Sequence, residues 1–252
     1  MAGYGGVTNN DPYLPGDLEV VPFVLRLSGE NDLDKGTKEG PVAWEPARNP
    51  LHHLQATAQF GLGLEFAKEY LRKNPGVTIG LIPCAWGGAA IEQLNQGTMH
   101  YKNAIERIKF ASKNGEIKGI LWHQGESNSV KPEIATLYAD KLDQLIEDLR
   151  SDINRPTLPF ICGDLAEFYG KGRSPEHQQG ILIVRRALNE LPFRVPHSYC
   201  VSTDGLESPD EHFVHFNRAS YIKLGQRYAQ AYLYLSKNDQ EPGNANLLPT
   251  SP

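Results

Sequence analysis

Short apolar runs alternate with longer amphipathic segments along most of the chain. Five apolar runs lie at 20–27, 77–83, 117–123, 158–164 and 198–203. Their continuous apolar character is typical of strands that are covered on both faces of a parallel sheet. Segments with helical spacing separate or follow them, at 57–73, 100–113, 131–152, 176–190 and 217–236. The alternation predicts an α/β fold, a three-layer α/β/α sandwich with a mainly parallel sheet.

The last predicted helix ends near residue 236. Asn217 stands at its start and is a good N-cap residue. Residues 237–252 are rich in Pro, Gly and Asn, and we expect them to form a mobile tail. Because no internal repeat or low-complexity linker divides residues 1–236, we expect one domain there.

The composition argues against several classes of protein. The formal net charge is −5 and no block of Lys and Arg occurs, so nucleic acid is not an expected partner. No apolar run approaches the roughly 18 residues of a membrane span, so no membrane partner is expected. The three cysteines lie far apart and match neither a disulfide framework nor a zinc pattern. Compartment and oligomeric state cannot be read from this sequence.

The loop after the run 77–83 contains adjacent glycines, Gly87 and Gly88. In α/β folds ligands bind at the carboxyl ends of the strands, so polar loops there are the first candidates for a site. Adjacent glycines allow a turn whose backbone N–H groups can hold an anion or a developing oxyanion. The alternative is a plain strand-to-helix turn. Trp86, just before them, can stack on a sugar ring or pack in the core.

The loop after the run 117–123 is crowded with polar groups. His123, Gln124, Glu126, Ser127 and Asn128 fall within six positions. A surface loop explains the last three, but the first two stand at the strand edge, where burial is expected and polar groups need partners. The sequence of this stretch is therefore compatible with either a functional loop or a plain surface loop.

A third polar loop precedes the final helix. His215 stands between two apolar residues and can act as a general base near neutral pH, or can be a structural loop histidine. The spacing His212-x-x-His215 also allows a metal pair. No third ligand stands at a fixed spacing, so we expect no metal ion there.

Taken together, the three loops supply most of what acyl transfer needs. A backbone nest, an amide, a carboxylate and a late histidine converge at the strand ends of one predicted sheet. The nucleophile is the part not found among them. Ser28 and Ser127 are interpreted as loop serines rather than as nucleophiles.

This set of motifs resembles the SGNH-hydrolase superfamily, whose fold is flavodoxin-like. Within it the chain is most similar to sialate O-acetylesterase-like and family-six carbohydrate esterases, which include plant carbohydrate esterase-like proteins. The resemblance runs from residue 1 to about 236 and rests on MAGYGGV, GLGLEFAKEYL, GLIPCAWGGAAIE, GILWHQGES and VHFNRASYIKLGQRYAQAYL.

The resemblance implies where the nucleophile belongs. In the family the first strand ends in Gly-Gln-Ser-Asn-Met-Ala-Gly, and its serine attacks the substrate. This chain begins Met1-Ala2-Gly3, so the serine, and with it the first strand, is expected to precede residue 1. Gly3 would then lie in the loop that leads away from the nucleophile and borders the substrate.

The resemblance also assigns roles to residues of the three loops. Gly88 corresponds to the backbone oxyanion donor, Gln124 to the side-chain donor and His215 to the catalytic base. Glu126 is the expected support for His215, because His212 stands where many members have Asp; Asp210 is the alternative. Contacts with the substrate are expected from a further set of residues: Gly3, Trp86, Gly87 and His123.

The activity implied is hydrolysis of acetyl esters on xylan-like or sialate-like sugars. It needs no metal or organic cofactor, and its partner is the acetylated carbohydrate itself. Residues 1–252 alone are expected to be impaired, because the serine would precede Met1. The alternative is a catalytically inactive protein that still binds acetylated carbohydrate.

Overall fold

The computed structural model describes residues 11–29, 31–32, 37–38, 42–52, 59–209 and 211–238. Three of the expectations above fall outside these ranges. They concern Gly3 with the strand expected before it, Asp210, and the mobility of the tail beyond residue 238.

The five predicted strands are confirmed, and each is shorter than the predicted run at one or both ends. They are β1 (Val24–Leu27), β5 (Ile79–Leu81), β6 (Ile120–Trp122), β7 (Phe160–Gly163) and β8 (Ser198–Val201). Three short strands were not predicted: β2 (Asn31–Asp32), β3 (Thr37–Lys38) and β4 (Trp44–Pro46). At two or three residues each, they are too short to show a periodic pattern.

The predicted helices are confirmed with one correction. The main helices are α1 (Leu62–Lys73), α2 (Met99–Ala111), α4 (Tyr138–Asp152), α5 (Pro175–Asn189) and α7 (Arg218–Asn238). The segment 131–152 is not one helix, because a short α3 (Pro132–Ala135) precedes α4. Further short elements are α6 (Leu191–Arg194) and the 3-10 turns η1 (Ile91–Gln93), η2 (Glu126–Asn128) and η3 (Glu167–Gly170).

The parallel strands form two three-stranded sheets in the described part of the chain. One has the order β4-β1-β5, in which β5 is parallel to β1 and β4 is antiparallel to it. The other has the order β6-β7-β8 and is parallel throughout. Strand β7 is buried along its whole length, whereas β5 and β6, at the edges, are partly exposed. The mainly parallel α/β fold is therefore confirmed, with the sheet divided between β5 and β6.

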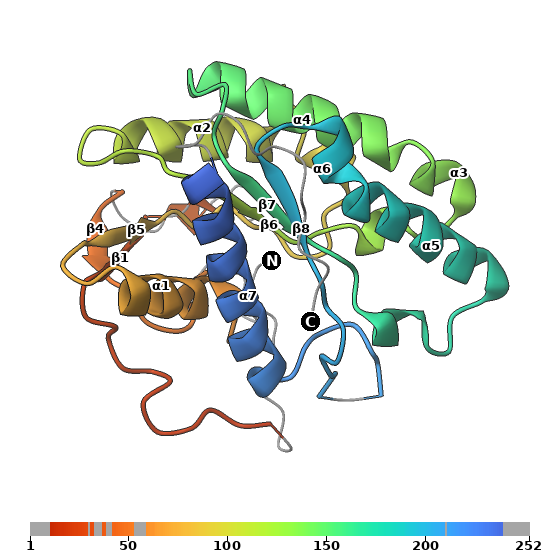
Figure 1. Cartoon of the computed structure of the whole chain (residues 1–252), viewed down its shortest axis with the longest axis horizontal. Helices are drawn as coiled ribbons and strands as arrows, with labels where there is room; N and C mark the ends of the chain where they lie inside the picture. The colour runs from red at the N-terminus through yellow and green to blue at the C-terminus, as the bar shows by residue number, and fades with distance from the viewer. Residues whose placement is uncertain are drawn as a thin grey trace.

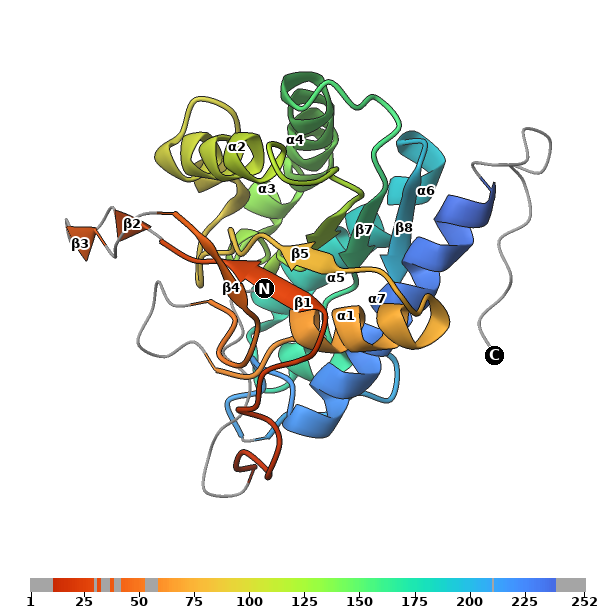
Figure 2. The same ribbon diagram turned by 90° about the vertical axis from the view of Figure 1, so that its left-hand side faces the viewer.

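Helices cover the strands from two sides. Helices α1 and α7 pack together on one side, and α2 and α4 lie on the other (Figures 1 and 2). The α1–α7 contact is close because Gly225 has no side chain; a Cβ there would lie 2.7 Å from the Leu62 carbonyl oxygen. The main core lies between these layers and contains fully buried Tyr138, Leu142 and Phe160.

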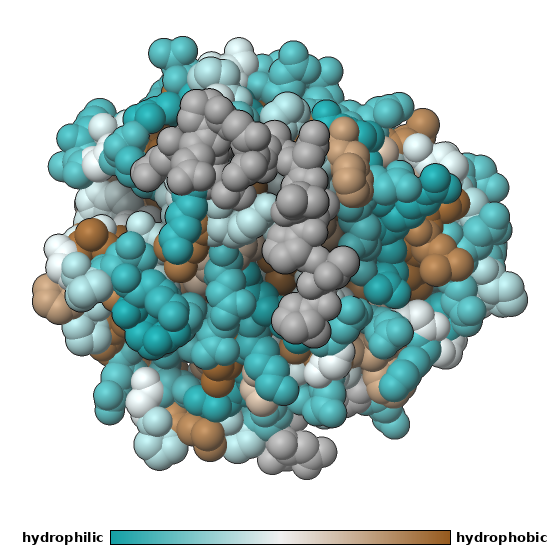
Figure 3. All heavy atoms as spheres, in the orientation of Figure 1, coloured by the Kyte–Doolittle hydropathy of each residue, from teal (hydrophilic) through white to brown (hydrophobic). Residues whose placement is uncertain are grey.

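The molecular surface is largely hydrophilic on the face shown in Figure 3, with hydrophobic residues in separate groups. Among the described residues no helix is long and apolar enough to cross a membrane.

The start of α7 is held by several polar contacts. Asn217 caps it as predicted, since its side-chain oxygen accepts a hydrogen bond from the Ser220 N–H at 2.8 Å. Arg218 donates two hydrogen bonds of 2.6 Å to the carboxylate of Asp17, whose side chain is 5% exposed. The Arg218 N–H also donates to Asp11. The segment after residue 11 is thereby fixed next to the loop that carries His215.

Candidate active site

The loop after β5 presents unpaired backbone donors. Gly88 has φ +75°, in the left-handed region that favours glycine, and a Cβ there would meet nothing within 4 Å. In the described part of the chain neither the Gly88 N–H nor the Ala89 N–H has a hydrogen-bond acceptor. Gly88 is exposed. The exposed Gly88 N–H can therefore bind an anion from solvent, as the predicted nest requires, whereas Ala89 is buried.

The loop after β6 lies directly against this first loop. Ser127 Oγ donates a hydrogen bond of 2.8 Å to the Gly88 carbonyl oxygen, and Gln124 Nε2 donates one of 3.0 Å to the Ala89 carbonyl oxygen. Two loops that are about 35 residues apart in the chain thus form one structure. This hydrogen bond also makes Ser127 a structural residue, in agreement with its interpretation as a loop serine.

The third loop reaches the same region through an aromatic contact. The buried ring of Phe216 lies 5.5 Å from that of His123, edge to face, and 5.3 Å from that of Phe168. His215, the preceding residue, is partly exposed, and His212 is exposed. The structure brings the loop of His215 to the loop of His123. The role of His215 as a base stays a prediction.

The amide of Gln124 has a fixed orientation. Its Nε2 donates to the Ala89 carbonyl oxygen and to Asn128 Oδ1 at 2.9 Å, which uses both of its hydrogens. Its Oε1 is buried and has no partner among the described residues. In this arrangement the Gly88 N–H is available to an oxyanion at once, whereas Gln124 would first have to release one of its two acceptors.

Glu126 has a buried carboxyl group although the residue as a whole is partly exposed. Burial raises the pKa of this carboxyl, and the N–H groups of Glu126 and Gly125 oppose the rise. Its carbonyl oxygen accepts hydrogen bonds from Ser129 Oγ at 2.7 Å and from Tyr169 Oη at 3.2 Å. Gly125, with φ +148°, allows this turn. Support of His215 by Glu126 stays a prediction, because Asp210, its alternative, lies outside the described residues.

His123 is a buried, neutral imidazole. Its Nδ1 lies 3.0 Å from Tyr228 Oη, whose single hydrogen is donated to the Trp122 carbonyl oxygen at 2.6 Å. Nδ1 must therefore carry the hydrogen and donate it to Tyr228, which leaves Nε2 as the acceptor. The ring fits over β7 because residue 163 is glycine; a Cβ there would lie 2.5 Å from Nδ1. Contact of His123 with a substrate stays a prediction.

The buried position of His123 makes stability depend on pH. Burial lowers the pKa of His123 to about 3, from 6.5 in an unfolded chain. Between these values the unfolded state binds more protons, so stability falls as the pH falls, by up to about 1.4 kcal/mol per pH unit. We expect His123→Asn to reduce the slope of the free energy of unfolding against pH, between pH 4 and 6, by the contribution of about one bound proton. Denaturant unfolding at a series of pH values measures it, and an unchanged slope would contradict a neutral buried ring.

Trp86 packs against α2 rather than standing free. Its ring lies 4.7 Å from that of His100, with an angle of 34° between the planes, and both residues are partly exposed. His100 covers one face of the indole, so a sugar ring would have to stack on the opposite face. That contact, and the contact predicted for the neighbouring Gly87, stay predictions.

Sequence reasoning missed the residues that join the loops. Asn128 was part of the polar run, but its fully buried position was not foreseen. Lys141, on α4, and Tyr169, in η3, carry no local signal, because their partners are 49 and 43 residues away. Among the described residues no group of three or more His, Cys, Asp or Glu side chains could hold a metal ion. The expectation of a metal-free site stays a prediction.

Comparison with known proteins identifies the family. A family profile described as carbohydrate esterase, sialic acid-specific acetylesterase matches residues 1–234. A probable carbohydrate esterase of Arabidopsis thaliana is 34% identical over 248 residues, covering 92% of this chain and 86% of that protein. A crystal structure of an Arabidopsis protein has a TM-score of 0.76 at 33% identity and covers 93% of each chain.

A more distant solved structure shares the fold. It is a carbohydrate acetylesterase from Xanthomonas citri, with a TM-score of 0.64 at 21% identity over 85% of this chain and 49% of that one. The profile match over nearly the whole chain, together with the Arabidopsis relative, shows the family. This chain belongs to the sialic acid-specific acetylesterase family of carbohydrate esterases.

Proposed function

We propose that the site formed by the three loops serves the hydrolysis of O-acetyl esters on carbohydrates, of the xylan-like or sialate-like kind. The observation that carries the proposal is the loop of Gly88 and Ala89, whose N–H groups have no acceptor among the described residues and which is held against the loop of Gln124 and Glu126. Donors of this kind stabilise the negative oxygen that forms when an ester carbonyl is attacked. The name of the Arabidopsis relative supports a carbohydrate ester as the substrate.

The proposed reaction proceeds through an acetyl-enzyme. A serine oxygen attacks the acetyl carbonyl carbon while His215 takes the serine proton, and the Gly88 N–H stabilises the oxyanion. The bond from the acetyl carbon to the sugar oxygen then breaks, and His215 returns the proton to the sugar. Water, activated by His215, releases acetate and restores the serine. Glu126 holds His215 in its working tautomer.

A second candidate function is binding of acetylated carbohydrate without turnover. It is the function expected of residues 1–252 taken by themselves, which contain no Gly-Gln-Ser-Asn motif. Ser28 and Ser127 do not replace it, since each donates a hydrogen bond to a backbone carbonyl oxygen, that of Ala43 at 2.9 Å and that of Gly88 at 2.8 Å.

Residues 1–252 allow these candidates to be tested directly. We expect them to bind acetylated xylo-oligosaccharide at least about tenfold more tightly than the deacetylated form, because the nest is placed to donate to the acetyl carbonyl oxygen, which the deacetylated sugar lacks. We expect slow release of acetate, unaffected by a chelator. Calorimetry and acetate release measure the two quantities. Equal affinity for both sugars would exclude acetyl recognition, and rapid release would show that a serine within the chain is the nucleophile.

A further inference from the structure

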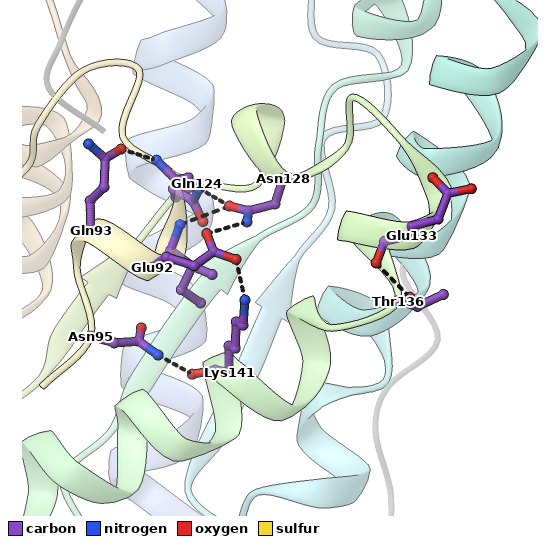
Figure 4. Close-up of polar contacts among 10 residues, drawn as sticks. Glu92, Gln93, Asn95, Gln124, Asn128, Glu133, Thr136 and Lys141 are labelled. Atoms are coloured by element: carbon purple, nitrogen blue, oxygen red, sulfur yellow. Dashed lines mark hydrogen bonds and ion pairs between the residues drawn. The ribbon is translucent and has the colours of Figure 1, made fainter.

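Asn128 is a fully buried amide at the junction of the first two loops. Its side-chain oxygen accepts hydrogen bonds from the Ile91 N–H and from Gln124 Nε2, both at 2.9 Å. Its side-chain nitrogen donates to Glu92 Oε2 at 2.9 Å. Figure 4 shows these contacts, with Glu92 on the first loop and Gln124 on the second. The residue has no exposed surface, so it cannot itself touch a substrate.

Glu92 is in turn fixed by a cation. Lys141, on α4, forms an ion pair with its second carboxylate oxygen. Burial works to raise the pKa of Glu92, but the hydrogen bonds from Lys141 and Asn128 outweigh it and lower the pKa. Glu92 is therefore an ionised carboxylate that can only accept, and it defines which end of the Asn128 amide faces it.

We propose that Asn128 is a positioning residue that orients the Gln124 amide and holds the loop of Gly88 against it. The direction of each hydrogen bond requires an amide at this position. The oxygen of Asn128 must face two donors and its nitrogen must face the Glu92 carboxylate. An apolar residue would leave the Ile91 N–H and Glu92 Oε2 without these partners. The catalytic consequence rests on the proposed function, whereas the structural consequence does not.

The direction of these bonds can be tested by exchanging the two partners. Asn128→Asp places a carboxylate oxygen opposite the Glu92 carboxylate, which repels it, while the acceptor for Ile91 and Gln124 is kept. Adding Glu92→Gln reverses the direction of the hydrogen bond between positions 92 and 128, because the glutamine nitrogen can donate to the aspartate carboxylate. Glu92→Gln alone is the control for loss of the Glu92 charge, since its one oxygen can accept from Asn128 or from Lys141 but not from both.

Hydrogen exchange gives a readout that does not depend on activity. We expect amide exchange in residues 90–94, most of whose N–H groups are hydrogen-bonded, to rise at least about tenfold in Asn128→Asp and to return to within about threefold of wild type in the double variant. Exchange in α7, which has no hydrogen bond to Asn128 or Glu92 among the described residues, should not change. If Asn128→Asp does not fold, recovery of native exchange in the double variant still supports the proposal. Unchanged exchange at 90–94, or a double variant no better than the single one, would overturn it.

Activity gives the second readout, in a form of the chain that carries the nucleophile. We expect Asn128→Asp to lower kcat at least about tenfold with KM changed less than threefold, and the exchanged pair to recover kcat. If wild type releases no acetate, the proposed function fails, and the exchange experiment still decides the role of Asn128. An active wild type whose kcat is unaffected by Asn128→Asp would overturn positioning.

Discussion

A chain that carries an apolar strand ending in Gly-Gln-Ser-Asn directly before Met1 is expected to hydrolyse p-nitrophenyl acetate roughly 10³-fold faster than residues 1–252. The physical reason is that an acyl-enzyme route needs an attacking oxygen, while the proposed base and oxyanion donors are already in the chain. Removing the nucleophile of such a site leaves only the contribution of oxyanion stabilisation and binding. Steady-state kinetics of the two proteins measures the difference.

The control is the same extension with alanine in place of serine. It preserves any effect of the added strand on folding, so only the oxygen differs. Strands β5 and β6 each have one edge without a hydrogen-bonded strand in the described part of the chain, so their backbone groups can pair with an added strand. Equal rates for the serine and alanine extensions would contradict the proposed mechanism.

Replacing His215 by alanine in the serine-bearing chain is expected to lower kcat by roughly 10³-fold. Without the imidazole, no group takes the serine proton as the oxygen attacks or returns it to the leaving sugar. KM for an acetylated xylo-oligosaccharide should change less, because His215 acts on the proton rather than on the sugar.

His212→Ala is the matched control for this substitution. It removes an identical side chain three positions earlier, in the same loop, and His212 is the more exposed of the two. We expect less than a threefold change in kcat. Comparable losses in both variants, reversed by added zinc, would instead support the metal pair that the spacing allows.

The fold was predictable because its strands carry a strong local signal. Strand β7 is buried on both faces, so its sequence is continuously apolar. The runs that become β1 and β8 are mainly apolar, although they include Arg26 and Ser198 and the middle of β8 is partly exposed. The break between α3 and α4 was not predictable, since the apolar spacing continues through Thr136 and Leu137. The division between β5 and β6 was not visible either, because strand order is a tertiary property.

The site was predictable only in its outline. Polar residues after parallel strands meet at one edge of a sheet, so the approach of the loops of Gly88 and Gln124 follows from topology. The partners of each side chain do not. Tyr228 sets the tautomer of His123 from a helix 105 residues away, and Asn128 uses up a donor of Gln124 only because the η2 turn brings the two side chains together.

The most direct test of the account is to map the adduct of a fluorophosphonate ester on the serine-bearing chain by mass spectrometry. Such a reagent mimics the tetrahedral intermediate and reacts rapidly only with a serine that has a base and oxyanion donors beside it. We predict one adduct per chain, on the added serine, formed much more slowly in His215→Ala. No adduct, or an adduct on Ser28 or Ser127, would contradict the assembly of the three loops into one esterase site.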